Sequence, residues 1–230
     1  MKIAICTPCH GDTRAAFTLS LAKMLMRTMS EWQHRFPSEP LTLDTFMGSG
    51  GIVALVRERL VETAEKWGAD WILWLDSDQT FPGDTLLRLI ESREPVIGAN
   101  IPHRSPDARP TAEILGGNGE RVPLYTTREK AAADEIEAAH LMGLGVCLTS
   151  MTALKALPRP IFNELREDHG LMRKLAASGF TPKVHHGLSA QVGHVGVFTW
   201  TNEHSLARQP RKVSVEIGAA GQALQKLSPE

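Results

Sequence analysis

Short apolar runs alternate with longer amphipathic stretches through the first half of the chain. The apolar runs cover residues 2–7, 41–47 and 71–75, and the stretches between them, residues 14–29 and 52–67, carry apolar residues at helical spacing. This pattern predicts the order β-α-β-α-β, which is typical of a parallel sheet covered by helices. We therefore expect an α/β fold with a mostly parallel central sheet flanked by helices.

The pattern loosens after residue 100, so we expect the C-terminal part to be less regular. No internal repeat is visible, and the last residues are polar. The remaining expected elements are a helix over residues 84–93, a strand over 95–99, a loop over 102–110, a strand over 111–115, a helix over 127–139, a strand over 142–148, helices over 151–157 and 167–178, and a strand over 181–185.

Composition narrows the classes of protein. Of 230 residues, 42% are hydrophobic, enough for an ordinary core, and 25 Lys plus Arg nearly balance 26 Asp plus Glu. Such a balance gives no global attraction to nucleic acid or to an anionic membrane.

The N-terminal apolar run is too short for a signal peptide or a membrane span, so a cytoplasmic location is expected. Three cysteines, Cys6, Cys9 and Cys147, are expected to be thiols.

The strongest chemical signal is Asp76-Ser77-Asp78, which directly follows the apolar run 71–75. Carboxylates beside a buried strand need a compensating charge, and the carboxyl end of a strand is where α/β sheets bind ligands. Residues two apart on a strand end face the same way, so both carboxylates could address one divalent cation that phosphate oxygens also bind. The structural alternative is that one Asp caps the helix beginning near Pro82.

Cys6-Thr7-Pro8-Cys9-His10 resembles a thioredoxin-type Cys-x-x-Cys and a c-type haem attachment site. A redox role would leave the Asp pair without a function. The pattern favours a loop that begins at Thr7-Pro8 over the top of the first strand, where a nucleotide base or ribose could lie. The glycines at 48, 50 and 51 precede a helix, but no Gly-Lys-Ser/Thr follows, so a P-loop is not supported.

Three further positions could carry chemistry. Arg57, near the start of a helix, could reach a diphosphate. Glu167-Asp168 opens a late helix, where one acid would suffice as a cap and a second is available as a base. His194 lies in a Gly-flanked segment that we expect to be a flexible loop, from which the imidazole could reach a metal held by Asp78; His186 is the other candidate for this role.

Together these motifs resemble small GT-A fold glycosyltransferases that are family 2-like, particularly the compact bacterial and phage-encoded kind. The resemblance spans about residues 3–196. The motifs that carry it, in order, are Thr7-Pro8, Arg57 with Leu60-Val61, Gly68-Ala69-Asp70-Trp71, Leu75-Asp76-Ser77-Asp78, Phe81-Pro82, Val96-Ile97-Gly98-Ala99 with Arg104, Gly143-Leu144-Gly145-Val146, Glu167-Asp168, and Leu188-Ser189 to His194. It implies a GT-A (Rossmann-like) domain over residues 1–205, with a nucleotide-binding half (1–100), an acceptor half (101–205) and a polar tail (206–230).

The resemblance also implies roles for individual residues. Asp78 would bind Mn²⁺ or Mg²⁺ at the donor diphosphate, Asp76 would contact the ribose or a metal-bound water, and His194 would be the third metal ligand. Asp168, in the Glu167-Asp168 pair, would be the catalytic base. The residues expected to contact the donor are Thr7, Pro8, Arg57, Asp76, Ser77 and Asp78.

The expected function is metal-dependent transfer of a sugar, with inversion, from a nucleotide sugar to an acceptor hydroxyl on a glycan, lipid or protein. Two alternatives stay open. Asp76-x-Asp78-x-Thr80 also fits the haloacid dehalogenase-like phosphatases, in which Asp76 would be the nucleophile, although that motif normally lies on the first strand. The other is a GT-A scaffold that binds nucleotide sugars without turnover.

Overall fold

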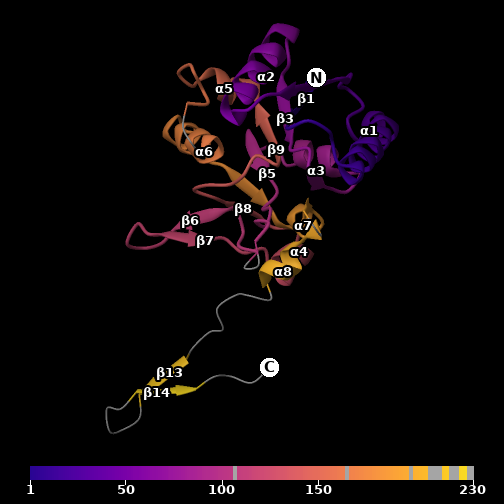
Figure 1. Cartoon of the computed structure of the whole chain (residues 1–230). Helices are drawn as coiled ribbons and strands as arrows, with labels where there is room; N and C mark the ends of the chain where they lie inside the picture. The colour runs from indigo at the N-terminus through magenta and orange to yellow at the C-terminus, as the bar shows by residue number, and fades with distance from the viewer. Residues whose placement is uncertain (106–107, 164–165, 197–198, 207–213, 218–222, 227–230) are drawn as a thin grey trace.

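A seven-stranded sheet forms the centre of the computed structural model, with helices on both of its faces (Figure 1). The structure describes residues 1–105, 108–163, 166–196, 199–206, 214–217 and 223–226. The strand order is β2-β1-β3-β9-β5-β10-β8, and β9 and β8 run against the other five strands. The strands are β1 (Lys2–Cys9), β2 (Thr42–Ser49), β3 (Trp71–Leu75), β5 (Val96–Gly98), β8 (Ile136–Ala138), β9 (Val146–Ser150) and β10 (Lys183–His185).

The sheet buries side chains on both faces, which explains the continuous apolar run of β3. Ile72 and Trp74 face one core with α2, α5 and α6, whereas Leu73 and Leu75 face the other with α1, α3 and α7. The helices are α1 (Ala15–Arg35), α2 (Val53–Trp67), α3 (Thr85–Glu91), α4 (Arg128–Ala132), α5 (Met151–Lys155), α6 (Glu167–Ala177), α7 (His186–Ser189) and α8 (Asn202–Leu206).

Short strands form three smaller sheets beside the central one. β4 (Gln79–Thr80), β11 (Gly193–Val195) and β12 (Thr199–Trp200) make one, and it begins directly after Asp76-Ser77-Asp78. The others are β6 (Glu113–Leu115) with β7 (Arg121–Pro123), and β13 (Ser214–Ile217) with β14 (Ala223–Lys226). Within the described residues, no helix is long and apolar enough to cross a membrane.

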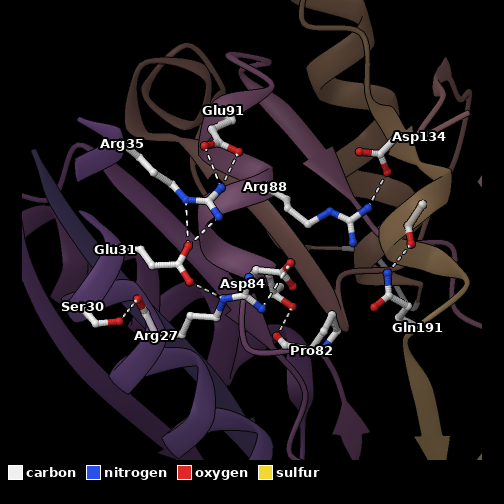
Figure 2. A network of polar contacts seen from close by, with 12 residues as sticks. Arg27, Ser30, Glu31, Arg35, Pro82, Asp84, Arg88, Glu91, Asp134 and Gln191 are labelled. Atoms are coloured by element: carbon white, nitrogen blue, oxygen red, sulfur yellow. Dashed lines mark hydrogen bonds and ion pairs between the residues drawn. The ribbon is translucent and has the colours of Figure 1, made fainter. Parts of the chain in front are cut away.

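Ion pairs tie α1 to α3 on the outside of the sheet (Figure 2). Arg35 Nη1 donates to Glu91 Oε1 at 2.9 Å, and the same side chain contacts Glu31 within α1. Arg27 extends the connection to Asp84 at 3.5 Å, just before α3. Because several charges are shared, this network holds α1 in place better than an isolated surface pair would.

The helix expected over residues 127–139 is wrong in its second half. Helix α4 ends at Ala132, Asp134 has a left-handed φ of 54°, and residues 136–138 form β8, antiparallel to β10 at the edge of the sheet. Arg88 forms an ion pair with Asp134 (Figure 2), and His186 N–H donates to the carbonyl of Glu135 at 2.9 Å. These tertiary contacts favour a strand over the local helix propensity of the Ala/Glu-rich sequence.

Two expected loops are also wrong. Strand β1 continues through Thr7-Pro8 to Cys9, because its parallel register with β2 extends to Cys9 opposite Ser49. Its pairing with β3 stops at Cys6, which leaves the last three residues of β1 unpaired on that side. His194 lies in β11, opposite Gln79 of β4, because backbone pairing holds this segment in extended form.

Candidate functional site

A cavity of about 650 Å³ lies where β1 and β3 end. The turn Asp76-Ser77-Asp78 forms one wall, and the loop before α1, the N-terminal part of α2 and the first residue of α6 form others. Its position at the carboxyl edge of parallel strands is the usual ligand site of α/β sheets. The lining residues are Pro8, Cys9, His10, Asp12, Thr13, Arg14, Gly50, Val53, Val56, Arg57, Asp76, Ser77, Asp78, Arg104 and Glu167.

Arg57 joins two carboxylates at the base of this cavity. Its Nη2 donates to Asp76 Oδ1 at 2.8 Å, and its Nε donates to Glu167 Oε1 at 3.4 Å. The Arg57 side chain is only 4% exposed, and its guanidinium lies 5.5 Å from the centre of the Trp74 ring. Burial alone would lower the pKa of Arg57, but the charges of Asp76 and Glu167 outweigh burial and raise it.

Asp78 belongs to a second group of charges. Its Oδ2 lies 3.0 Å from Arg104 Nη1 and 3.4 Å from His194 Nε2. Burial alone would raise the pKa of Asp78, but the contact with His194 and the charge of Arg104 more than offset burial, so this pKa lies below its usual value. The two Asp residues of the motif therefore face different partners.

The backbone brings His194 to Asp78. In β11 it pairs antiparallel with Gln79 of β4, and Val195 N–H donates to the carbonyl of Asp78 at 2.8 Å. His194 Nδ1 lies 2.9 Å from the carbonyl oxygen of Pro102. A carbonyl only accepts, so Nδ1 carries a proton, and in the neutral ring the lone pair is on Nε2, directed at Asp78.

Asp78 offers an oxygen donor and His194 a nitrogen donor to a divalent cation. A neutral imidazole lone pair and a carboxylate oxygen repel each other, so a contact of 3.4 Å between them fits either an imidazolium or a cation between the two atoms. Ligands at adjacent octahedral positions lie about 3 Å apart when each is about 2.1 Å from the metal. The hydrogen bond from Nδ1 is the arrangement that orients metal-bound histidines. Asp78 and His194 are therefore candidate ligands of a divalent metal ion.

Asp76 does not complete a three-ligand cluster with them. Among the described residues, no group of three or more His, Cys, Asp or Glu side chains is arranged to hold a metal ion. One carboxylate oxygen of Asp76 is taken by Arg57. A site with two protein ligands leaves room for phosphate oxygens and water, as is usual for Mg²⁺ bound with a nucleotide.

Gly145 lets the backbone of the adjacent loop approach this motif closely. Its carbonyl accepts a hydrogen bond from Asp76 N–H at 2.9 Å. A Cβ at position 145 would lie 2.7 Å from Ile101 Cδ1, 3.2 Å from Asp76 Oδ2 and 3.3 Å from Gln79 Cδ. The position of the Asp76 carboxylate therefore depends on the absence of a side chain at residue 145.

The other expected site residues are distributed in and around the cavity. Pro8, Ser77 and Glu167 line it, but Thr7 is buried at 2% exposure and does not. Asp168 is also outside the lining, and its Oδ1 accepts a hydrogen bond from His169 N–H at 2.7 Å. It directly follows Glu167, which lines the cavity, so Asp168 lies near the cavity.

His186, the other candidate metal ligand, lies elsewhere. Its Nδ1 is 2.9 Å from Thr126 Oγ1, and its Nε2 is 2.9 Å from Glu137 Oε2. The side chain is fully buried and does not line the cavity. Because His186 lies outside the cavity that Asp78 lines, His194 is the better candidate ligand.

The cavity also contains residues to which the sequence pattern assigned no role. His10, Asp12, Thr13 and Arg14 come from the loop between β1 and α1, and Arg14 N–H donates to the carbonyl of Ser77 at 3.4 Å. Arg104 comes from the loop after β5. The available signal was the concentration of polar residues after the first and fourth strands of the β-α pattern.

No protein-family model matches the sequence, and no curated protein matches it significantly. Solved structures do match the fold. A197 from STIV is similar at a TM-score of 0.59 and 14% identity, covering 89% of this chain and 92% of that chain. GalNAc-T7, a GT-A glycosyltransferase crystallised with UDP, GalNAc and Mn²⁺, is similar at a TM-score of 0.51 and 10% identity, covering 85% of this chain.

The chain has the GT-A fold. The mixed, mostly parallel seven-stranded sheet with helices on both faces is the architecture expected from the sequence. The match spans 44% of the GalNAc-T7 chain, and at these identities it establishes the fold alone. The cavity at the end of β3 and the Asp78–His194 pair are therefore the observations from which a function is argued.

Proposed function

We propose that this protein is a metal-dependent glycosyltransferase that transfers a sugar from a nucleotide sugar to an acceptor hydroxyl with inversion. The observation that carries the proposal is the contact between His194 Nε2 and Asp78 Oδ2, 3.4 Å, at the wall of the 650 Å³ cavity. GT-A structures such as GalNAc-T7 with UDP, GalNAc and Mn²⁺ support this reading by analogy of fold.

The donor would lie in the cavity with its nucleoside against β1 and α2. Pro8, Val53 and Val56 offer apolar surface there for a base. Arg57 is fixed by Asp76 and Glu167, so it offsets the negative charge of these carboxylates in the donor pocket without having to move. Its role would be to orient Asp76 and Glu167 and to favour the leaving diphosphate electrostatically.

Asp78 and His194 would hold the metal ion, Mn²⁺ or Mg²⁺. When bound, such an ion neutralises the negative charge that develops on a departing diphosphate. Pro102 holds the imidazole of His194 through Nδ1, and Val195 N–H holds the backbone of Asp78. Both ligands are therefore positioned before the ion arrives, which reduces the cost of assembling the site.

The acceptor would bind at the rim beside the first turn of α6. A base for the acceptor must face the rim, because the donor fills the cavity itself. Glu167 lines the cavity and is engaged by Arg57, whereas Asp168 lies just outside the lining. We propose Asp168 as the residue that takes the proton from the attacking hydroxyl, with Glu167 as a positioning residue.

The test begins with binding. Calorimetry with UDP, GDP, ADP and CDP, each with Mn²⁺ or with EDTA, should find one nucleoside diphosphate that binds only in the presence of metal. Asp78→Asn should lose that binding, whereas Asp168→Asn should retain it. If no nucleoside diphosphate shows metal-dependent binding to the wild-type protein, the proposal is wrong.

Turnover separates an enzyme from a binding scaffold. The corresponding nucleotide sugars, incubated with Mn²⁺ and a mixed glycan, lipid and peptide acceptor panel, should release nucleoside diphosphate. Release should be lost in Asp168→Asn although binding persists. Binding without release for every donor and acceptor would instead favour the non-catalytic scaffold. We do not propose the phosphatase reaction, because Arg57 holds the Asp76 oxygen at 2.8 Å and Asp76 would have to attack as a nucleophile.

A further inference from the structure

Arg104 is placed where a cation would bind Asp78. Its Nη1 lies 3.0 Å from Asp78 Oδ2, the same oxygen that faces His194 Nε2. A second, longer contact joins Nη1 to the carbonyl of Val195 at 3.4 Å. The guanidinium thus balances the Asp78 carboxylate and contacts the strand that carries His194.

Arg57 and Arg104, two of the three arginines that line the cavity, differ in their freedom to move. Arg57 has a side chain only 4% exposed and is held by carboxylates through two nitrogens. Arg104 has a side chain 45% exposed and extends from the loop after β5. An ion pair that water reaches contributes little stability, so Arg104 can leave Asp78 at low cost.

We propose that Arg104 covers Asp78 when no donor is bound and moves to the donor diphosphate when the donor and the metal bind. This inference rests on the proposed function and adds a regulatory role for one residue. Arg104 and a divalent cation compete for the same Asp78 oxygen. A diphosphate removes that competition, because it offers the guanidinium new oxygens and also binds the cation.

The consequence is cooperative binding of metal and donor. Mn²⁺ alone binds weakly, because it must displace Arg104 from Asp78 and is repelled by that charge. A nucleoside diphosphate alone also binds weakly, because Arg104 is paired with Asp78 and not with the phosphates. Together they bind more tightly than either does alone, and by linkage each raises the affinity for the other by the same factor.

Arg104→Met tests the inference, because it removes the charge and keeps most of the volume. Mn²⁺ alone should bind this variant about threefold more tightly than the wild type, since one exposed ion pair no longer competes. The nucleoside diphosphate that the wild type binds best should bind the variant about tenfold more weakly in saturating Mn²⁺, since one Arg–phosphate contact is lost. Calorimetry and Mn²⁺ electron paramagnetic resonance measure both affinities.

Arg121→Met is the matched control. Arg121 is 49% exposed and paired with Glu113 at 3.5 Å, and neither residue lines the cavity, so its loss removes the same charge from a comparable environment. It should change neither affinity. Opposite shifts in the two affinities of Arg104→Met are specific, because general damage to the site would weaken both.

The outcomes separate the inference from the proposed function. If the wild type binds Mn²⁺ and nucleoside diphosphate cooperatively but Arg104→Met binds Mn²⁺ no more tightly, this inference is wrong and the function stands. An unchanged diphosphate affinity in Arg104→Met also overturns it. If the wild type shows no metal-dependent nucleoside diphosphate binding, the proposed function fails and the inference fails with it.

Discussion

His194 Nε2 lies 3.4 Å from Asp78 Oδ2, although the two residues come from distant parts of the chain. Three backbone interactions produce this contact: the pairing of Gly193 with Thr80, that of His194 with Gln79, and the hydrogen bond from Val195 N–H to the carbonyl of Asp78. A two-residue strand after the Asp motif thus determines which histidine faces it.

Replacement of His194 by Ala should weaken Mn²⁺ binding in the presence of nucleoside diphosphate by at least about tenfold, because one of the two proposed protein ligands is removed. In EDTA the diphosphate should bind neither the variant nor the wild type. Electron paramagnetic resonance of free Mn²⁺ during titration measures the affinity. His34→Ala, at the exposed end of α1, is the control and should bind as the wild type does. If His194→Ala binds Mn²⁺ as tightly as the wild type does, His194 is not a metal ligand.

Replacement of Arg57 by Met should lower the free energy of unfolding by about 2–3 kcal/mol, because Asp76 and Glu167 then lose the buried charge that compensates them. The part of Asp76 that is exposed to water keeps the loss at the lower end of the range for buried pairs. Urea denaturation followed by tryptophan fluorescence measures it. Arg59→Met, on the exposed face of the same helix, should change stability by less than about 0.5 kcal/mol. Similar losses in the two variants would contradict the assigned role of Arg57.

Replacement of Gly145 by Ala should cost about 1–2 kcal/mol of stability and weaken nucleoside diphosphate binding severalfold, because the new methyl group displaces Ile101 and the Asp76 carboxylate. Urea denaturation and calorimetry measure the two effects. Gly117→Ala is the control, since a Cβ there would meet nothing within 4 Å. A Gly145→Ala protein that binds the diphosphate as well as the wild type would show that Asp76 tolerates the displacement.

Stability should fall between pH 7 and pH 5.5 because of two buried histidines. Burial, the largest cause, lowers the pKa of His185 and of His186. Below about pH 6.5 the unfolded chain binds protons at these positions and the folded protein does not, so unfolding becomes more favourable as pH falls. Each histidine contributes up to about 1.4 kcal/mol per pH unit within this window.

The groups that face these histidines do not reverse the sign. Glu137 and Lys130 face His186, and Asp134 and Arg88 face His185; the pKa of Glu137 is lowered, so that carboxylate titrates below the window. Urea denaturation at pH 7.5, 6.5 and 5.5 measures the slope. His186→Gln should flatten it by removing one titrating group. A free energy of unfolding that stays constant across this range would contradict the expectation.

The sequence predicted the elements correctly where the local hydrophobic pattern matched the burial found in the fold. The continuous apolar run of β3 predicts its ends, since a strand covered on both faces needs apolar residues at every position. Gly68 ends α2 where expected, with a left-handed φ of 80°. For residues 133–139 the same reasoning predicted a helix, which is wrong. Their composition favours a helix, but pairing with β10 and the contacts of Asp134 and Glu135 favour a turn and a strand.

By itself the sequence determined three things: the β-α order of the first half, the apolar strand that leads into Asp76-Ser77-Asp78, and the place of Arg57 on the helix before that strand. Each of these depends on residues close together in the chain, whose spacing reflects helix or strand geometry. Only the tertiary structure decided how the charges are shared. It assigns Asp76 to Arg57 and Asp78 to His194 and Arg104, and it excludes His186 from the cavity. Such pairings are contacts between distant segments, set by strand register and loop packing, and no local pattern encodes them.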